Sequence, residues 1–474
     1  MLLASPGASQ RNEYDLKTSE FQRCKFPAAI ILALVLVLPS LFPQSAEAQR
    51  RGISLIRDAE IEALVKDYAR PLMRAAGLRA GSIRFQIVND GGFNAFVSGR
   101  GLYLNTGLLL QAEDPNEVIG VIAHELGHII GGHQVRLRER IDNASRIARW
   151  TTLLGIGLGA AGAASGNSQV GSAGFGIAAS SGNFALRDVL RYQRNEETSA
   201  DRVAVKLLKS TKQSGQGMLN TFKRLARNTN VLSGRIDPYL RSHPTPNQRI
   251  TNLRSIVQSS PYFNQKTSSS LRKRHDMVRA KIAAYIGGSR YAKAVLADKK
   301  LHPDAQLYGR AILAHLYGSP KRAVPLINKL LKTNSKNAYI HEMLGEIMLR
   351  SGKASLAATS FRKALKNDRT KSGYIRIELG HALVESGKRE NLDEAIVQLN
   401  KGLARDRTAI AGYQYLAIAY GRKGETSKAL LASADYALRT GKRDQAKEYA
   451  QRAQLKFKRG SPGWLRAQDI ITFK

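Results

Sequence analysis

Residues 119–133 read IGVIAHELGHIIGGH and place three histidines and one glutamate in an otherwise apolar run. A buried helix does not take imidazoles and a carboxylate into apolar surroundings without partners, because an unpaired buried charge is costly. Residues four apart share one face of a helix, so His124 and His128 direct two imidazoles to one point. Glu125 lies one position round the helix and can reach a water held there. This HExxH spacing is typical of zinc-assisted hydrolysis.

A catalytic zinc needs a third protein ligand and an open position for water. His133 is one candidate, because the longer motif HExxHxxGxxH adds a histidine three residues after a glycine, and Gly131 occupies the glycine position. The histidine of that motif would fall at Gln134, so His133 is one residue, about 100°, out of register. We therefore expect His133 to lie outside the metal site, facing solvent or supporting a ligand at the helix end.

The second candidate for the third ligand lies in RNEETSADRVAV, residues 194–205. Glu197 and Asp201 are four apart on a predicted helix whose inward positions are apolar. Glu197 can bind the metal, and Asp201 can hydrogen-bond a ligand histidine and fix its tautomer. Two solvated acids in a charged segment are the alternative, and this segment alone does not decide between them.

HELGH, then E-x-x-A-D at Glu197 and an H-P loop at His243, resembles the gluzincin metalloendopeptidases of the CAAX-prenyl-protease and heat-shock HtpX type over about residues 53–255. The resemblance implies one zinc ion per chain. It implies the zinc ligands His124, His128 and Glu197, with Glu125 as the general base.

The same resemblance implies roles for further residues. Asp201 corresponds to the family's aspartate beside a ligand histidine. His243 corresponds to a histidine near the metal, which either donates a hydrogen bond to the oxyanion or occupies the fourth zinc position in a closed, resting state; the sequence leaves both open. Arg249 is a candidate for orienting the loop of His243. The family's edge strand, on which substrate docks as an added β-strand, corresponds to Asn94, Ala95 and Phe96.

The elements that position these residues are mainly helices. Apolar residues at helical spacing predict a helix over Ile53–Ala75. Asp114, Pro115 and Glu117 form a capping signal that begins the helix of the HExxH motif. A further helix is expected from Leu186 to about Lys209. Three short strands are predicted at the following ranges: 83–88, 93–97 and 101–105.

The segment Thr151–Asn183 is rich in Gly, Ala and Ser. It resembles a membrane segment, but it is too glycine-rich and too weakly apolar to insert securely. We predict close-packed helices of small residues and a mobile loop.

The second half of the chain repeats itself. The segments Leu344–Leu365 and Leu379–Leu403 align, with Gly345 and Gly380 35 residues apart. This period and its pattern of small residues resemble the tetratricopeptide repeat. Four units are expected over about residues 290–460.

The predicted fold is mainly α with a small β-sheet (α+β): an HExxH zincin-like catalytic domain followed by an α-helical tetratricopeptide-repeat solenoid. The expected divisions are a signal peptide over residues 1–48, a metallopeptidase domain over 49–258, a linker or connecting helix over 259–289, and a repeat domain over 290–474.

The N-terminus carries the pattern of a secretory signal. Arg23 and Lys25 precede an apolar run over residues 27–42, and a small-residue cleavage site ends at Ala48. Cleavage there would also remove Cys24, which is the single cysteine of the chain. A cysteine-free, exported chain points to the periplasm.

The charge is strongly positive, with 74 Lys and Arg against 37 Asp and Glu in 474 residues, a net charge of +37. Such a surplus favours an acidic partner. In the periplasm we expect an anionic membrane surface rather than nucleic acid.

Together these features predict an exported zinc metalloendopeptidase. Within the family, the chain resembles the periplasmic branch with tetratricopeptide repeats. This resemblance implies that the protein cleaves unfolded or misassembled outer-membrane proteins. It also implies that the repeats contact the assembly machinery of those proteins, and that the protein has a chaperone role. The alternative is a periplasmic scaffold or chaperone whose peptidase domain is plugged or inactive.

Overall fold

The structure is a computed structural model that describes residues 53–165, 168–229, 243 and 246–473. These residues all belong to one compact unit, Ile53–Lys474. The predicted signal peptide, residues 1–48, lies outside the described residues.

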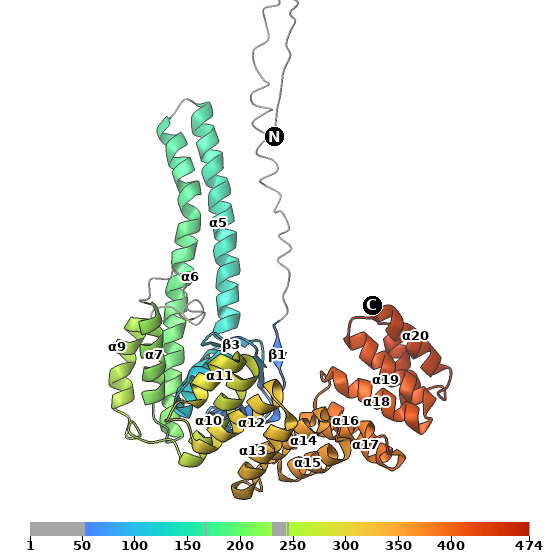
Figure 1. Cartoon of the computed structure of the whole chain (residues 1–474). Helices are drawn as coiled ribbons and strands as arrows, with labels where there is room; N and C mark the ends of the chain where they lie inside the picture. The colour runs from blue at the N-terminus through green and yellow to red at the C-terminus, as the bar shows by residue number, and fades with distance from the viewer. Residues whose placement is uncertain (1–52, 166–167, 230–242, 244–245, 474) are drawn as a thin grey trace, which may run out of the picture. The chain divides into compact units, whose positions relative to one another are not determined.

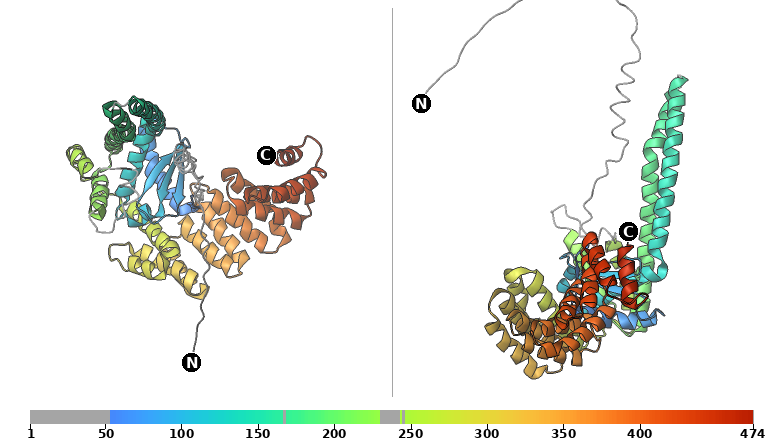
Figure 2. Two further views of the ribbon diagram at one scale, coloured as in Figure 1. Left: turned by 90° about the horizontal axis from the view of Figure 1, so that it is seen from above. Right: turned by 90° about the vertical axis from the view of Figure 1, so that its right-hand side faces the viewer.

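A small sheet with the strand order β1-β2-β4-β3 lies at the centre of the N-terminal half (Figures 1 and 2). Strands β2 and β4 are parallel, whereas β3 pairs antiparallel with β4 and forms one edge. The three predicted strands are confirmed. The observed bounds are β1 Leu55–Ile56, β2 Arg84–Val88, β3 Ala95–Ser98 and β4 Gly101–Asn105.

The helix predicted over Ile53–Ala75 is wrong at its start. Leu55 and Ile56 pair with β2 as strand β1. Helix α2, Ala59–Ala75, begins after Asp58, whose side chain accepts a hydrogen bond from the Ile61 backbone at 2.8 Å. This N-cap separates two apolar runs that a helical period alone would join.

Helix α4, Pro115–Gly131, carries the HExxH motif and begins with the predicted capping box of Asp114 and Glu117. It ends at Gly132, whose φ of +64° is left-handed. The short helix α3, Thr106–Gln111, precedes it.

Two long helices follow, α5 over His133–Ala164 and α6 over Ser168–Ser210, side by side along their length (Figures 1 and 2). The close-packed helices predicted for Thr151–Asn183 are present, and the helix predicted from Leu186 to Lys209 is part of α6. The mobile loop predicted there falls between α5 and α6, where residues 166–167 lie outside the described residues. Among the described helices, none is long and apolar enough to cross a membrane.

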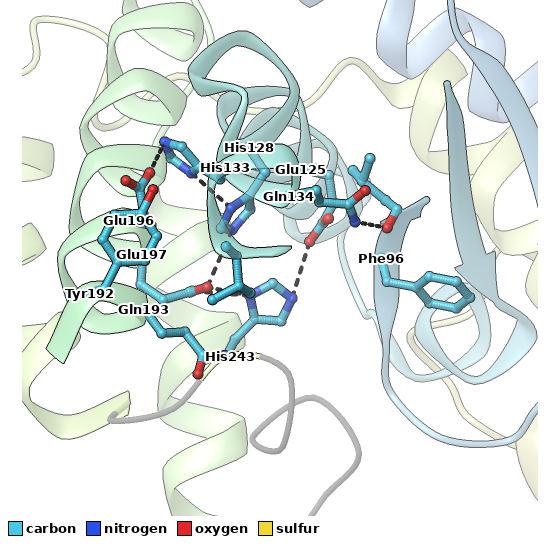
Figure 3. Close-up of a pocket in the computed structure, with 12 residues that line it drawn as sticks. Phe96, Glu125, His128, His133, Gln134, Tyr192, Gln193, Glu196, Glu197 and His243 are labelled. Carbon is cyan, nitrogen blue, oxygen red and sulfur yellow. Dashed lines mark hydrogen bonds and ion pairs between the residues drawn. The ribbon is translucent and has the colours of Figure 1, made fainter. Parts of the chain in front are cut away.

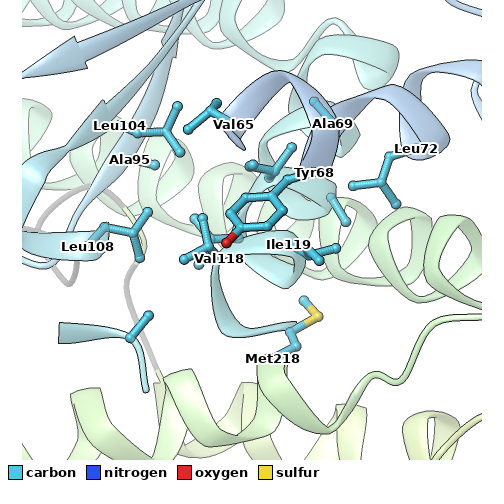
Figure 4. Close-up of a cluster of buried hydrophobic side chains, with 14 of the residues drawn as sticks. Val65, Tyr68, Ala69, Leu72, Ala95, Leu104, Leu108, Val118, Ile119 and Met218 are labelled. Atoms are coloured by element: carbon cyan, nitrogen blue, oxygen red, sulfur yellow. The ribbon is translucent and has the colours of Figure 1, made fainter. Parts of the chain in front are cut away.

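The core of this half packs α2, α4 and the sheet against helix α7, Gln216–Thr229, and helix α9, Pro246–Gln258. Tyr68 and Leu108 are among its fully buried side chains, and Met218 packs from α7 (Figure 4). Burial of this apolar surface holds α4 rigidly against the sheet.

Helix α10, Ser269–Ile286, lies in the predicted linker but is buried. Val278 and Ile282 join the first core, whereas Met277 and Ala280 join the core of the repeats. The predicted connecting helix is therefore a packed element shared by both halves.

The remaining helices form antiparallel pairs, and the predicted repeat solenoid is confirmed. Gly345 lies against the Phe361 ring and Gly380 against Leu399, where an added Cβ would come within 2.8 Å and 2.4 Å. The helices are α11 Gly288–Leu296, α12 Pro303–Tyr317, α13 Pro320–Thr333, α14 Ala338–Arg350, α15 Ala354–Asn367, α16 Gly373–Glu385, α17 Leu392–Arg405 after a 3-10 turn Arg389–Asn391, α18 Ile410–Lys423, α19 Thr426–Arg439, α20 Arg443–Gln454 and α21 Pro462–Ile471.

Candidate metal centre

The crossing of α4 and α6 brings the two sequence motifs together. Gly127, inside HELGH, touches the α6 backbone at Ala200, and an added Cβ would lie 2.7 Å from the Ala200 carbonyl oxygen. This close approach is open only to glycine. It places Glu197 and Asp201 of α6 beside the histidines of α4.

Three side chains converge at this crossing, and each is buried or nearly so. The Nε2 atoms of His124 and His128 are 3.0 Å apart. Each of these nitrogens lies 3.3 Å from an oxygen of Glu197. Two imidazoles and a carboxylate gathered this tightly could hold one metal ion.

The donor set fits a tetrahedral zinc ion. Ligands held at 2.0–2.1 Å in a tetrahedron are separated from one another by about 3.3 Å. The observed separations of 3.0–3.3 Å among His124, His128 and Glu197 are close to that value. Nitrogen and carboxylate donors are also the types that zinc accepts.

His243 completes the group (Figure 3). Its Nδ1 lies 3.3 Å from His124 Nε2 and 3.0 Å from both oxygens of Glu197. Its Nε2 lies 3.3 Å from Glu125 Oε1. His243 is therefore the fourth member of the donor group, and it lies between the other three side chains and the carboxylate of Glu125.

Asp201 contacts His124 on the side of the ring away from the donor group. His124 Nδ1 donates to Asp201 Oδ1 at 2.9 Å, which leaves Nε2 for the metal. Burial acts to raise the pKa of Asp201, but the Arg249 guanidinium and His124 outweigh it, so this pKa is lowered and the carboxylate stays charged.

Arg249 has a more central place than the sequence indicates. Its guanidinium binds Asp201 at 2.7 and 2.8 Å and reaches Glu197 at 3.0 Å, and it stacks over the Phe222 ring with 4.4 Å from Cζ to the ring centre. One cation thus holds both Glu197 and Asp201. The sequence marks Arg249 by its position shortly after His243, but not its contacts with Asp201 and Glu197, which arise where the helices pack.

Glu125 is 1% exposed, and this burial raises its pKa to about 7. A carboxylate with such a pKa exchanges a proton readily near neutral pH, which is what a general base requires. The nearby imidazoles of His124 and His128 act in the opposite direction and keep the rise moderate.

His133 lies outside the four-residue donor group, but it does not face solvent. It is 4% exposed, its Nδ1 lies 2.9 Å from Nδ1 of His128, and its Nε2 forms an ion pair with Glu196. The register argument assumed one continuous helix, whereas the left-handed Gly132 ends α4. The new helix turns His133 towards the rear of the His128 ring, which it supports.

Strand β3 borders the site as the predicted edge strand. Asn94 stands just before it, and its carbonyl accepts from the Asn105 backbone at 3.0 Å. Because bonded and non-bonded pairs alternate in an antiparallel ladder, the N–H and C=O groups of Ala95 and Val97 point to the free edge. Phe96 stacks on Tyr103 at 4.9 Å between ring centres.

A cavity of about 120 Å³ lies between this edge and the candidate metal centre (Figure 3). Gln134, Tyr192 and Glu196 line it, and sequence reasoning missed all three as site residues. The Gln134 side-chain amide donates to the Val97 carbonyl, one of the free-edge groups. Gln134, which the sequence analysis noted only as the residue at the histidine position of the longer motif, thus contacts the predicted docking strand.

An HExxH helix crossed by a helix bearing glutamate and aspartate defines the gluzincin class of zinc metallopeptidases. Residues 56–257 match Peptidase family M48, so this part of the chain is a metallopeptidase domain, joined to a tetratricopeptide-type solenoid.

The chain is similar to curated relatives over most of its length. It is 24% identical over 426 residues to the "Beta-barrel assembly-enhancing protease" of Escherichia coli (strain K12), covering 87% of this chain and 83% of that protein. It is 26% identical over 311 residues to the "Putative beta-barrel assembly-enhancing protease" of Vibrio cholerae serotype O1, covering 63% and 60%. The crystal structure of YrrB, "a TPR protein with an unusual peptide-binding site", aligns with 37% of this chain and 91% of its own at 19% identity and a TM-score of 0.31.

Proposed function

We propose that this chain is a periplasmic zinc endopeptidase that cleaves unfolded or misassembled outer-membrane proteins. The observation that carries the proposal is the convergence of His124, His128 and Glu197 with Glu125 alongside. The substrate class is supported by the relatives named for β-barrel assembly, and the compartment by the secretory pattern of residues 1–48.

The three ligands His124, His128 and Glu197 would hold one zinc ion. When bound, zinc lowers the pKa of a water and polarises the scissile carbonyl. Glu125 accepts the proton of that water and delivers it to the leaving amine, which suits its pKa of about 7. Asp201 holds His124 in the tautomer that keeps Nε2 available.

The free edge of β3 binds the substrate backbone. Ala95 and Val97 offer alternating N–H and C=O groups to an added strand. Main-chain pairing tolerates many side chains but requires an extended chain, which an unfolded protein supplies and a folded one does not.

His243 occupies the fourth corner in a resting state. It stands between Glu125 and the ligand atoms, where the attacking water belongs. This arrangement favours the closed, resting role over the oxyanion role left open by the sequence, and it gives substance to the alternative of a plugged scaffold. Activity would require His243 to leave this position.

The repeats bind protein. A hollow of about 630 Å³ on α17 to α19 and α21 is lined by Tyr413 and Leu416 together with basic side chains, among them Arg407 and Lys428. Such a mixture of apolar and cationic groups suits acidic polypeptide segments of substrates or of the assembly machinery. A chaperone role would use the same surface. The domain divisions at 48, 258 and 289 are part of this proposal.

The proposal is tested by Glu125→Gln, with the exposed Glu139→Gln as its matched control. Casein cleavage should fall 10²- to 10⁴-fold in Glu125→Gln alone, while both variants keep one zinc per chain. Cleavage that survives in Glu125→Gln would overturn the mechanism. A wild-type chain without stoichiometric zinc would support the inactive scaffold instead.

A further inference from the structure

We propose that the tip of the α5–α6 hairpin inserts into one leaflet of an anionic membrane and docks the protein there. The tip is defined as residues 150–165 and 168–186. It contains no charged residue between Arg149 and Arg187, although 23% of the whole chain is charged. An uncharged stretch of this length in so charged a chain is the first observation.

Large apolar side chains face outward on this tip rather than into the hairpin. Trp150 and Leu154 are each 64% exposed, and Leu153 is 61% exposed. With Ile147 and Leu158 they follow helical spacing along one side of α5. Further exposed apolar residues are Ile156, Val170, Ile177 and Leu186. A contiguous exposed apolar patch of this kind marks an interaction site.

The two helices are held together without those side chains. Added Cβ atoms on Gly155, Gly162 and Gly174 would lie within 2.7 Å of the facing backbone, so the helices touch backbone to backbone. Packing by small residues with apolar side chains directed outward is the pattern of helix pairs in lipid, where association rests on close contact rather than on apolar burial.

At its base the same hairpin is held by polar contacts of the kind used in water. Arg140 pairs with Asp188 at 3.0 Å, and Arg136 bonds Tyr192 at 3.0 Å and Glu196 at 3.2 Å. The change from ion pairs to glycine contacts along one pair of helices indicates a change of surroundings from water to hydrocarbon.

Arginines ring the boundary between the two parts. Arg149 and Arg187 are the first charged residues below the tip. Arg146 and Arg191 lie further down, and all four arginines are exposed. The one acid among them, Asp188, pairs with Arg140. Within the part of the chain that the structure describes, no acidic side chain pairs with any of these four. Trp150 adjoins this collar, at the depth where tryptophan is enriched in membranes. The collar fits anionic head groups.

The length of the tip limits how far it can enter. The segment Trp150–Ala164 is about 22 Å long at 1.5 Å per residue. A bilayer is about 40–45 Å thick with its head groups, so one leaflet is about 20–22 Å deep and the tip can enter it without spanning. None of the described helices is long and apolar enough to cross a membrane. The segment that the sequence marks as too weakly apolar to insert securely as a membrane segment therefore enters one leaflet only. Arginines at the base favour lipid over an apolar protein groove.

The test is flotation of the mature full-length chain with vesicles of phosphatidylcholine alone or with 30% phosphatidylglycerol (about a third anionic lipid). We expect the wild type to bind the anionic vesicles, and we expect added salt to weaken this binding. The double substitution Leu153→Glu with Leu154→Glu should weaken it at least tenfold. The double substitution Arg146→Glu with Arg149→Glu should weaken it as well. The matched control is Leu455→Glu with Leu465→Glu, exposed leucines of the repeat domain at 88% and 52%.

Trp150 provides a second readout, because the chain has two tryptophans and Trp464→Phe leaves Trp150 alone. Its emission should shift to the blue and be quenched by brominated lipid. Circular dichroism of each variant checks folding. The proposal is overturned if the wild type does not float, if the repeat-domain control loses binding equally, or if the tip variants change only self-association or capture of a protein partner. None of these readouts depends on peptidase activity.

Discussion

Arg249 donates a fork of two hydrogen bonds to Asp201, with Nε 2.8 Å from Oδ2 and Nη2 2.7 Å from Oδ1. This fork fixes the carboxylate plane, and the same carboxylate accepts from His124 at 2.9 Å. The orientation of a proposed metal ligand on α4 is therefore set by a pair formed between α6 and α9.

Asp201→Asn should weaken zinc binding by about 10- to 100-fold, because an amide holds the His124 tautomer less firmly and leaves Arg249 without its partner. Zinc affinity is measured by competition with a chelator. Asp444→Asn, at an exposed position in α20, is the control. Equal affinities for Asp201→Asn and the wild type would show that the fork does not act on the site.

His243→Ala should raise casein cleavage while zinc remains bound by three ligands. The imidazole stands 3.3 Å from Glu125, in the space that a water needs, and alanine would vacate it. Initial rates and zinc content are measured together. A fall in kcat with zinc retained would instead assign His243 to the oxyanion.

Gln134→Ala should lower KM for unfolded substrates by about two- to tenfold with little change in kcat, since one hydrogen bond has a net value near 0.5–1.5 kcal/mol. The Gln134 amide binds the Val97 carbonyl, which a docking strand would use. Gln445→Ala in α20 is the control. A raised KM would mean that Gln134 helps to hold the substrate rather than competing with it.

The local parts of this site were predictable from sequence. The His124–His128 pair needs only the helical repeat, and the start of α4 needs only Asp114 and Glu117, three residues apart. The tetratricopeptide fold followed from a period repeated along the chain. Each of these features shows in the spacing of residues along the chain, within a few turns of helix or as a repeated period, so spacing alone predicts it.

The features that the sequence did not predict depend on how helices and strands pack against one another. Strand β1 has two residues and owes its conformation to β2. His133 was placed by a helical register that the left-handed Gly132 interrupts. The Arg249 fork arises where α9 crosses α6, a contact between residues 48 apart. No local pattern encodes such a crossing.

His275 links the stability of the peptidase core to pH. It is fully buried on α10, its Nδ1 contacts the Tyr68 hydroxyl at 2.9 Å, and its Nε2 donates to the Ala112 carbonyl at 2.9 Å. Burial lowers its pKa to about 4, so the ring is neutral in the folded chain. In the unfolded chain it takes up a proton near its ordinary pKa of about 6.5.

Since the pKa of His275 is lower in the folded chain than in the unfolded chain, its contribution to the free energy of unfolding is fully present above pH 6.5. This contribution is lost as pH falls towards 4. The loss amounts to about 3 kcal/mol of the free energy of unfolding. Urea unfolding of metal-free protein should show this slope, and His275→Gln should flatten it, whereas His381→Gln in α16 should not. Parallel pH profiles for His275→Gln and the wild type would mean that another group carries the acid sensitivity of this core.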